Sequence, residues 1–412
     1  MALREAYVLI VGSEILEGRR RDINLFFLAP RLARLGVPVH EMRIVPDVPG
    51  VLPAALRELA APGRLLITTG GLGPTRDDLT RSEVADAFGK PLVESPEARK
   101  HLQAWCDRTG RKFADAGLLQ LEVPEGTQAL DNPRGTALGM WLEVEPDCVV
   151  VSLPGVPSEV EAIWGAGLEK RLQQGRPVAA TSKFFTAGLG EGVQEERMRG
   201  MEWPAAVDFC SLPGALGVEI QLECRLDDEA EAARRVARAQ KLLLPLLEPY
   251  VIHPLGMNPA EALVATLKAK GWQVSFAESC TAGLASGTLA SVPGASEVLE
   301  GSIVTYANRI KTDFVEVSPE ILATHGAVSG ETVEAMARGV RKLFGADLGL
   351  AVSGVAGPDG GTPEKPVGTV WLGASLGDRT LSEKLSLTGS RDEIRARSAW
   401  RLLVMGLRLL QA

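Results

Sequence analysis

The chain has 412 residues, too many for one ordinary hydrophobic core, so two or three domains are expected. A hydrophobic content of 45% and a charged content of 23% are typical of a globular protein, and the net charge of −8 argues against a broad nucleic-acid-binding surface. No segment approaches the roughly 20 apolar residues of a membrane span, and the start of the chain lacks the pattern of a signal peptide. We therefore expect a cytoplasmic protein that contacts neither a membrane nor nucleic acid directly.

The few cysteines and histidines restrict the metal and redox chemistry of the chain. Its five cysteines are scattered without a CxxC pair, which argues against a disulfide framework and against a structural zinc site. Its four histidines form no HxH or HxxxH arrangement, so a histidine-rich metal site is not expected either.

Residues 1–170 alternate strand and helix signals. Strands are expected at 6–12, 37–45, 64–69 and 147–155, and helices at 22–36, 53–61 and 81–89. Strands separated by helices imply a parallel sheet with helices on both of its faces.

Residues 171–250 have a different pattern. The stretch "GVEIQLECRL" at 217–226 alternates apolar and polar side chains, which is typical of a strand with one wet face. A charged helix is expected directly after it. This segment is predicted to be a small α+β domain, either a spacer or a dimer contact, and we expect a homodimer.

Residues 251–412 return to the α/β pattern. Asn258, followed by Pro259 and Glu261, predicts a capped helix start. Strands are expected at 272–277, 303–307, 348–353 and 368–375, and an amphipathic helix at 391–410 closes the chain. The predicted fold is therefore α/β, with two three-layer α/β/α domains at 1–170 and 251–412. Their sheets are mostly parallel, and the small α+β domain joins them.

A glycine-rich loop with two carboxylates, "TTGGLGPTRDDLT" at 68–80, follows an expected strand. Its glycines let the backbone approach a ligand closely, and Asp77 and Asp78 would repel a phosphate unless a hard cation such as Mg²⁺ bridged them. The loop thus predicts a metal-assisted phosphate site. A plain turn with helix-capping aspartates is the alternative.

Further polar loops follow other strands of the same expected sheet. Asp47 follows the strand at 37–45, "LPGVPSE" ends the strand at 147–155, and "NPRGTALG" lies at 132–139. Ligands of open α/β sheets bind at the carboxyl ends of the strands, where these loops would meet.

The motifs "VGSEILEG", "DIN", "PD", "TTGGLGPTRDDLT" and "LPGVPSE" resemble the molybdopterin-binding domain of the MoaB/MogA type and, more closely, the N-terminal half of the CinA family. The sequence "NPRGTALG" departs from the family's pattern by carrying Leu138 where the family has proline. The resemblance implies an ADP-ribose pyrophosphatase that uses a divalent metal, with Asp78 in catalysis and Asp47 and Asp78 as metal ligands. The substrate-binding residues that it implies are Asn24, Gly70, Gly71, Gly73, Pro74, Thr75, Asn132 and Gly155.

A second constellation combines a serine, a tyrosine and a lysine without histidine. Ser279 lies just past the strand at 272–277, and Tyr306 and Lys311 lie on and after the strand at 303–307. If these strands are neighbours, the side chains can meet above the sheet, where a lysine with a lowered pKa could deprotonate the serine. Arg309 is a nearby cation that would lower this pKa.

Several other interpretations of these residues stay open. Ser279 can cap a helix, Lys311 can be a solvated surface residue, and Tyr306 can be an ordinary strand residue. Cys280 competes as a nucleophile or is simply buried. Backbone N–H groups at the start of the following helix can hold an oxyanion. The loop "SGVAGPDGG" at 353–361 can cradle a ribose or phosphate, or can be a turn without a ligand.

The motifs "AESCTAG", "GSIVTYANRIK", "HGAVSGETVEAMA" and "SGVAGPDGGTPEKPVGTV" are similar to the C-terminal deamidase domain of the CinA family. The resemblance implies hydrolysis of nicotinamide mononucleotide (NMN) to nicotinic acid mononucleotide and ammonia, without a metal. Ser279 would be the nucleophile, Lys311 the general base and Tyr306 an assisting hydroxyl. The substrate-binding residues that it implies are Thr281, Gly283, Asn308, Arg309, Gly354, Gly357, Gly360 and Gly361.

A rival interpretation is a pterin- or nucleotide-binding adaptor for DNA uptake without catalysis. The complete set of Ser279, Tyr306 and Lys311 argues against a purely structural role.

Overall fold

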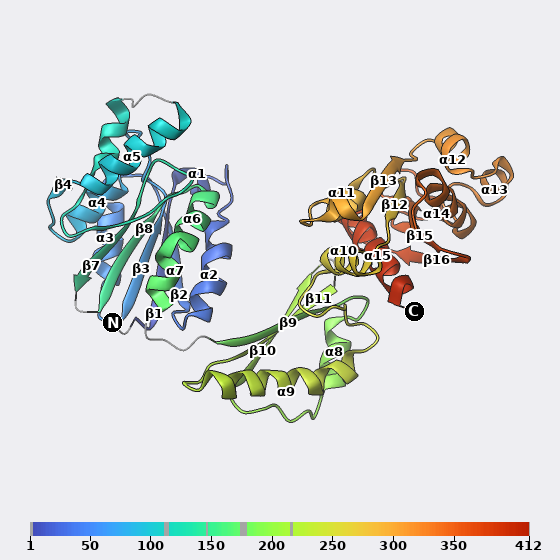
Figure 1. Ribbon diagram of the computed structural model, residues 1–412, viewed down its shortest axis with the longest axis horizontal. Helices are drawn as coiled ribbons and strands as arrows, with labels where there is room; N and C mark the ends of the chain where they lie inside the picture. Colours follow the sequence, from blue (N-terminus) through green and yellow to red (C-terminus); the bar gives the residue numbers. More distant parts are fainter. Residues whose placement is uncertain (1–2, 111–114, 146, 174–178, 215–216, 412) are drawn as a thin grey trace. The chain divides into compact units, whose positions relative to one another are not determined.

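The computed structural model describes residues 3–110, 115–145, 147–173, 179–214 and 217–411. The chain divides into two compact units (Figure 1). The N-terminal unit comprises Met1–Ala179 with Arg225–Ala232, and the C-terminal unit comprises Ala180–Cys224 with Ala233–Ala412. The small sheet expected within 171–250 thus groups with the C-terminal unit, and the three-domain division stays a prediction.

The N-terminal unit contains a six-stranded sheet in the order β2-β1-β3-β8-β7-β6. The first four strands are parallel, whereas β7 and β6 run antiparallel to their neighbours. The strands are β1 (Glu5–Val11), β2 (Val39–Val45), β3 (Arg64–Thr69), β6 (Gln128–Leu130), β7 (Gly139–Glu145) and β8 (Cys148–Leu153). The mostly parallel sheet is confirmed, and β6 and β7 are additions that the alternation of strands and helices does not reveal.

Both faces of this sheet are covered, as the nearly continuous burial of β1 requires. Val8 and Ile10 pack on one side with α2 and α6, and Tyr7 and Leu9 pack on the other side with α3 and α4. The helices of the unit are α1 (Ser13–Leu16), α2 (Asn24–Arg34), α3 (Val51–Leu59), α4 (Thr80–Ala87), α5 (Pro96–Thr109), α6 (Pro157–Ile163) and α7 (Glu169–Gln173). A 3₁₀ segment (Asp115–Leu121), a π-helical turn (Trp164–Leu168) and a small hairpin of β4 (Leu92–Glu94) with β5 (Glu122–Pro124) complete it.

A three-stranded antiparallel sheet in the order β10-β11-β9 belongs to the C-terminal unit. Its strands are β9 (Ala180–Thr186), β10 (Val207–Gly214) and β11 (Gly217–Cys224), and the helices next to them in sequence are α8 (Glu191–Met198) and α9 (Glu229–Leu247). The alternation predicted for β11 is confirmed: Val218, Ile220, Leu222 and Cys224 are buried, and Gln221 between them is exposed.

The larger sheet of the C-terminal unit has five strands in the order β13-β12-β14-β15-β16. The strands are β12 (Val274–Glu278), β13 (Leu299–Val304), β14 (Leu348–Gly354), β15 (Thr369–Leu376) and β16 (Arg379–Ser386). β13, β12 and β14 are parallel to one another, and β15 runs antiparallel to both β14 and β16. Because β12 lies between β13 and β14 and runs parallel to both, the carboxyl ends of these three strands lie at one edge of the sheet.

Helices cover both faces of this sheet as well. Phe276 of β12 packs into a cluster with α10 and α15, whereas Ala277 faces a second cluster with α14. The helices are α10 (Pro259–Lys270), α11 (Leu284–Ala290), α12 (Asn308–Val315), α13 (Pro319–His325), α14 (Gly330–Phe344) and α15 (Arg391–Gln411), with a 3₁₀ turn at Ala295–Glu297. The predicted cap of α10 is confirmed, since the Asn258 and Glu261 side chains form a reciprocal capping box.

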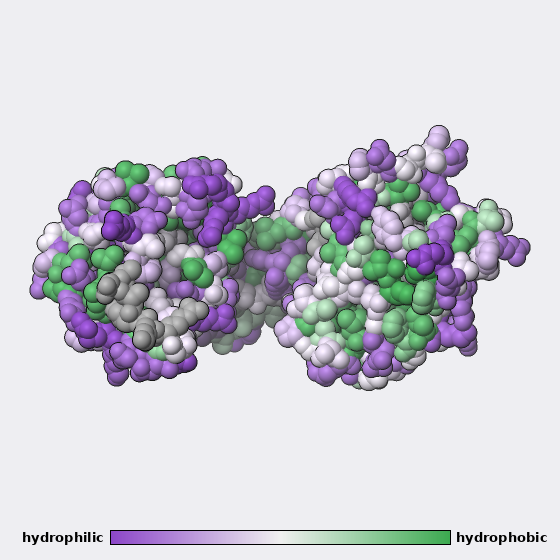
Figure 2. Space-filling view, turned by 90° about the horizontal axis from the view of Figure 1, so that it is seen from above, coloured by the Kyte–Doolittle hydropathy of each residue, from purple (hydrophilic) through white to green (hydrophobic). Residues whose placement is uncertain are grey.

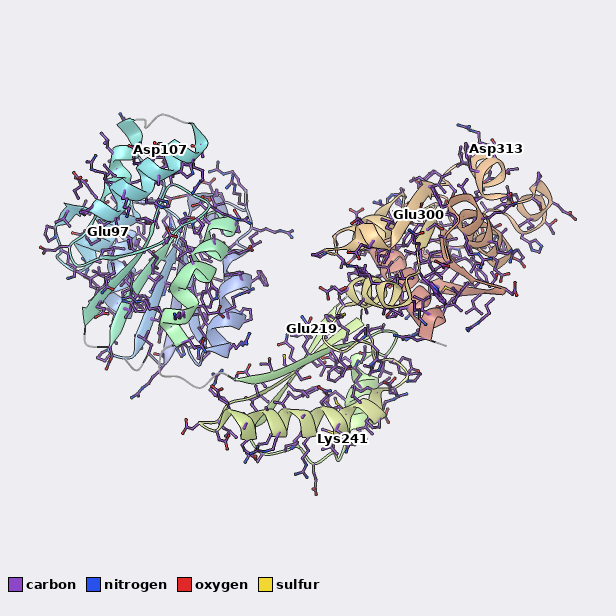
Figure 3. All side chains as sticks on the ribbon, viewed as in Figure 1. Glu97, Asp107, Glu219, Lys241, Glu300 and Asp313 are labelled. Atoms are coloured by element: carbon purple, nitrogen blue, oxygen red, sulfur yellow. The ribbon has the colours of Figure 1, made fainter. Side chains whose placement is uncertain are left out.

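On the face shown in Figure 2, polar residues predominate, and apolar residues gather mainly on the C-terminal unit. Glu300 and Asp313, both labelled in Figure 3, are exposed charged residues of this unit. Within the described residues, no helix combines the length and the apolar character that crossing a membrane requires.

Candidate functional site

The structure brings Ser279 and Lys311 together in the C-terminal unit. Lys311 Nζ lies 3.3 Å from Ser279 Oγ. Ser279 is 9% exposed and Lys311 is 1% exposed, so the pair is almost fully removed from solvent. An amine next to a hydroxyl in such a place is the arrangement that a serine nucleophile with a lysine base requires.

The strand ends of the sheet bring this pair together. The Ser279 N–H, directly after β12, donates to the Val352 carbonyl of β14, and the Thr305 N–H, directly after β13, donates to the Glu278 carbonyl. Lys311 follows in the first turns of α12 and reaches back, with Nζ 2.6 Å from the Thr305 carbonyl oxygen. The predicted strand at 303–307 was placed too late, because β13 ends at Val304; Lys311 reaches the serine from a helix.

Burial lowers the pKa of Lys311, because charging an amine away from water is unfavourable. Arg309, which we expected to lower this pKa, is exposed and is not among the causes of the shift. The burial of Lys311 contrasts with Asp313, two residues later on α12, which points to solvent (Figure 3). A lowered pKa increases the fraction of uncharged amine that can accept a proton from Ser279.

Cys280 does not have the features of a nucleophile. It is 4% exposed, and burial raises the pKa of its thiol to about 12. The thiolate is the reactive form of cysteine, so a raised pKa makes this side chain inert near neutral pH. Of the two interpretations open from the sequence, the structure supports the buried one.

Tyr306 bonds to an arginine through its hydroxyl, and the role of this group as an assisting hydroxyl stays a prediction. Its side chain is 57% exposed, and its hydroxyl accepts a hydrogen bond of 3.1 Å from Arg391 Nη2. Its carbonyl oxygen, by contrast, lies 3.4 Å from Lys311 Nζ. Arg391 also donates from Nη1 to the Gly357 carbonyl, so it links the start of α15 to two loops at the strand ends.

The remaining predicted binding residues of this unit lie around the same strand ends. Thr281 and Gly283 belong to the turn after Ser279, Asn308 and Arg309 are exposed at the start of α12, and Gly354 ends β14. Gly357 and Gly360 have positive φ angles of 76° and 86°, which suit glycine, and a Cβ on Gly361 would lie 2.9 Å from the Val367 nitrogen.

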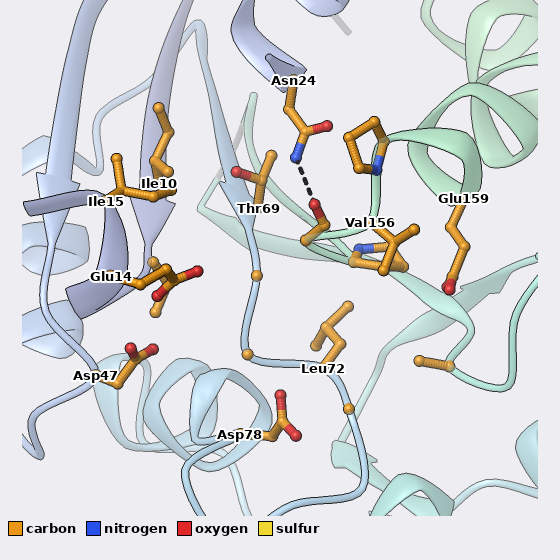
Figure 4. A pocket seen from close by; sticks show the side chains of 18 of the residues that line it. Ile10, Glu14, Ile15, Asn24, Asp47, Thr69, Leu72, Asp78, Val156 and Glu159 are labelled. Carbon is orange, nitrogen blue, oxygen red and sulfur yellow. Dashed lines mark hydrogen bonds between the residues drawn. The ribbon is translucent and has the colours of Figure 1, made fainter. Parts of the chain in front are cut away.

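The N-terminal unit holds a pocket of about 620 Å³ at the carboxyl ends of its parallel strands (Figure 4). Of the predicted residues, those that line it are Asn24, Asp47, Gly70, Gly71, Gly73, Pro74, Asp78 and Gly155. Thr75 and Asn132 support the lining: Thr75 bonds to Asp78, and Asn132 Nδ2 donates to Glu159. A pocket of this size accommodates a nucleotide-sized ligand.

The glycine loop of this pocket is built so tightly that side chains are excluded. Gly70 and Gly71 have φ angles of 104° and 68°, and a Cβ on Gly71 would lie 2.2 Å from Thr80 Oγ1. The Thr80 hydroxyl donates to the Gly70 carbonyl, and the buried guanidinium of Arg81 donates to the Leu72 and Gly73 carbonyls. Neither Asp77 nor Asp78 caps α4, whose N-cap is Leu79 without a side-chain bond.

The carboxylates in this pocket are of a kind that fits Mg²⁺, which is usually held by one or two carboxylates together with substrate phosphates and waters. Asp47 Oδ2 accepts from the Ser13 N–H, and Asp78 Oδ2 accepts from the Thr75 N–H. Within the described ranges, no three His, Cys, Asp or Glu side chains form a complete ligand set. Asp47 and Asp78 would therefore hold the cation only together with ligand oxygens.

A buried acceptor points to a ligand in the same pocket. Asn24 is 4% exposed, and its Nδ2 donates to the Gly155 carbonyl at 3.1 Å (Figure 4). Its Oδ1 has no hydrogen-bond partner among the described residues, although it is buried. Buried polar atoms normally have partners, so a ligand donor at this position would satisfy Asn24.

Several residues at these sites were not identified from the sequence. Glu14, Arg20, Arg21 and Glu159 also line the N-terminal pocket, and Figure 4 shows the Glu14 and Glu159 carboxylates within it. In the C-terminal unit, the additional residues are Glu278, Arg391 and Arg395. Glu159 and Glu278 lie inside the motifs that carry the family resemblance. Arg391 and Arg395 lie in the first two turns of α15, and nothing in the local sequence indicates which carbonyl groups they bond to.

Comparisons with known proteins agree with the two units. Residues 7–174 match the family described as "Probable molybdopterin binding domain", and residues 257–410 match the family described as "CinA C-terminal domain". The fold and its sites thus define an α/β protein in which a molybdopterin-binding-type domain precedes a CinA C-terminal domain.

Full-length relatives identify the family. A competence-damage inducible protein of Symbiobacterium thermophilum is 37% identical over 420 residues, covering 98% of both chains. A CinA-like protein of Gemmatimonas aurantiaca is 35% identical over 401 residues, covering 95% of this chain and 93% of that one. The chain belongs to the CinA family.

Solved structures of related proteins match parts of the chain. The competence/damage inducible protein CihA from Agrobacterium tumefaciens is 38% identical and covers 37% of this chain and 94% of its own, with a TM-score of 0.36. The protein CinA from Thermoplasma acidophilum is 32% identical and covers 42% of this chain and 99% of its own, with a TM-score of 0.38.

Proposed function

We propose that the C-terminal unit is an amidohydrolase that converts NMN to nicotinic acid mononucleotide and ammonia. The observation that carries the proposal is the buried contact of Lys311 Nζ with Ser279 Oγ at 3.3 Å. An uncharged amine has two N–H donors and one lone pair. The Thr305 and Tyr306 carbonyl oxygens, at 2.6 and 3.4 Å from Nζ, can take the two donors, which leaves the lone pair for the serine proton.

The reaction follows from this geometry in two steps. Lys311 accepts the Ser279 proton while Oγ bonds to the carboxamide carbon; the C–N bond then breaks, and ammonia leaves with the proton from Lys311. Water next attacks the acyl-serine ester and gives a proton to Lys311, which returns it to Ser279 Oγ as the acid is released. The balance is amide plus water to acid plus ammonia.

Ammonia release from NMN by the purified chain tests this proposal. We expect turnover by the wild-type chain, loss of turnover in Ser279→Ala, and a mass increase on Ser279 when the acyl intermediate is trapped by rapid acid quenching. Full activity of Ser279→Ala would refute the proposed mechanism, and absence of ammonia from the wild type would refute the substrate.

We further propose that the N-terminal pocket hydrolyses the pyrophosphate of ADP-ribose with a divalent cation. Support comes from the approximately 620 Å³ pocket, the carboxylates of Asp47 and Asp78, and the buried acceptor of Asn24. A bound cation would neutralise the phosphate oxygens, and the exposed Arg20 and Arg21 at the pocket would add positive charge. Production of AMP and ribose 5-phosphate from ADP-ribose, lost in Asp78→Asn, is the expected result.

A further inference from the structure

The turn that carries Ser279 is held by a buried carboxylate. Glu278 is 0% exposed and immediately precedes the serine. Its two oxygens accept hydrogen bonds of 2.8–3.0 Å from the N–H groups of Gly283, Ala285 and Ser286 and from the Ser286 hydroxyl. A buried carboxylate is costly unless it is this well satisfied, so it fixes the path from β12 into α11.

A guanidinium holds the same turn through its carbonyl groups. Arg395, from α15, donates from Nε to the Cys280 carbonyl at 3.2 Å and from Nη2 to the Thr281 carbonyl at 3.0 Å. Arg395 also lies 3.4 Å from the exposed carboxylate of Asp392. The planar fork of arginine suits two neighbouring acceptors, which a lysine cannot engage in the same way.

The backbone of the turn needs such support. Ala282 has a φ of 51° and Gly283 a φ of 93°, so two consecutive residues lie in the left-handed region. This region is unfavourable for alanine and persists only where the surroundings enforce it. Glu278 accepts a hydrogen bond from the Gly283 N–H, and Arg395 donates to the carbonyl groups of the residues that precede Ala282, so both ends of this segment are held.

We propose that Glu278 and Arg395 are positioning residues, which together fix the 279–283 turn so that Ser279 Oγ faces Lys311 Nζ. Because a trans peptide directs its C=O and N–H in opposite directions, the bond from Arg395 to the Cys280 carbonyl also fixes the direction of the Thr281 N–H. This N–H is thereby set as a donor to the oxyanion formed after serine attack. The inference rests on the proposed serine chemistry and adds the residues that preorganise it.

Kinetics of Arg395 variants test the positioning role. We expect Arg395→Lys and Arg395→Ala to lower kcat by about 10- to 100-fold, less than the about 100- to 1,000-fold loss when an oxyanion donor is removed outright. KM should stay nearly constant, because the oxyanion exists only after attack. Added guanidinium should restore activity to Arg395→Ala in a saturable manner and should leave Arg395→Lys unchanged.

The matched control is Arg397→Gln, on the same helix, whose side chain bonds to the Thr388 carbonyl away from the turn. It should keep wild-type kcat and KM. A loss in Arg397→Gln equal to that in Arg395→Ala would overturn the positioning role, because it would show a general effect of charge. An unchanged kcat in Arg395→Ala would also overturn the positioning role.

Glu278→Gln tests the other side of the turn. The amide presents an NH₂ group to backbone donors that need an acceptor, so we expect a kcat loss at least as large as that of Arg395→Ala. Ser286→Ala removes only one of the four donors and should have a smaller effect. If Glu278→Gln does not fold, the Arg395 variants alone decide.

Labelling of Ser279 by a fluorophosphonate separates this inference from the choice of substrate. The probe reacts with an activated serine without NMN, so the labelling rate should fall in Arg395→Ala and recover with guanidinium. Slow labelling in Arg395→Ala supports the inference even if NMN is not hydrolysed. Labelling of Arg395→Ala at the wild-type rate, or no labelling of the wild type, would overturn it.

Discussion

Lys311 is the residue on which the proposed chemistry depends, because it is uncharged only when its pKa is lowered. Burial supplies that shift, and the carbonyl oxygens of Thr305 and Tyr306 orient the amine. We predict that kcat/KM for NMN rises with pH along an acid limb whose apparent pKa lies below the ordinary lysine value of about 10.4.

A pH–rate profile with Lys311→Arg as the comparison measures this effect. Arginine keeps the charge but does not deprotonate, so this variant should be inactive at every pH. A wild-type limb at or above the ordinary lysine pKa would contradict the assignment of Lys311 as the base.

The same lowered pKa has a consequence for stability. Between the lowered pKa of the folded state and the ordinary pKa of the unfolded state, only the unfolded chain binds the proton, so the free energy of unfolding rises with pH in this window. Below both values the contribution is unfavourable and constant. Urea unfolding at several pH values should show this rise for the wild type and a smaller rise for Lys311→Met.

For Cys280 we predict that substitution leaves the activity nearly unchanged. Because its thiol is buried and its pKa is raised to about 12, replacing it should not remove the reacting group. We expect Cys280→Ala to keep NMN turnover within about threefold of wild type while it loses about 1–2 kcal/mol of stability through the small cavity. Thiol-specific reagents should likewise leave activity intact. Loss of turnover at unchanged stability would make the cysteine a participant.

At the scale of elements, the inner strands of the larger C-terminal sheet were predictable, whereas its two edge strands, β13 and β16, were not. The strand at 272–277 was recognised because both of its faces are buried and the run is apolar. β13 was placed too late, because at the sheet edge its residues alternate between half-buried and exposed and no local pattern marks its end. β16 was missed for a similar reason, since its polar sequence becomes a strand only by pairing with β15.

The candidate site of the C-terminal unit was also predictable only in part. The meeting of Ser279 with Lys311 could be anticipated, because both residues follow strands whose carboxyl ends share an edge. The contribution of Arg395 could not, since it lies 115 positions after Cys280 and no spacing shows which turn it reaches.

The glycine loop of the N-terminal unit gives a prediction at the scale of a loop. In Gly71→Ala, the new Cβ would lie 2.2 Å from Thr80 Oγ1 in a left-handed conformation, so the loop must move. We expect loss of ADP-ribose hydrolysis with unchanged NMN turnover, measured on the same preparation. Gly89→Ala is the matched control: its φ is 61°, but a Cβ there meets no atom of the described residues within 4 Å. Equal loss in both variants would show that backbone strain alone is responsible.

At the scale of the whole molecule, each unit has its own main sheet with its own apolar clusters. The described residues that line the N-terminal pocket belong to its own unit, and the contact of Ser279 with Lys311 lies in the other. The carboxylates of Asp47 and Asp78 suit a hard cation, whereas the Ser279–Lys311 pair supplies a nucleophile and a base without one. The two proposed reactions should therefore respond differently to removal of divalent metal.

We predict that a chelator abolishes ADP-ribose hydrolysis by the intact chain and leaves NMN deamidation unchanged. Both products are measured in one sample before chelation, after it, and after Mg²⁺ is returned. Ser279→Ala should show the reverse pattern, with deamidation lost and metal-dependent hydrolysis kept. If chelation slowed both reactions equally, the metal would act on a property that the units share, and the separate assignment of Asp47 and Asp78 to one reaction would be wrong. If it slowed neither, these carboxylates would act without a cation.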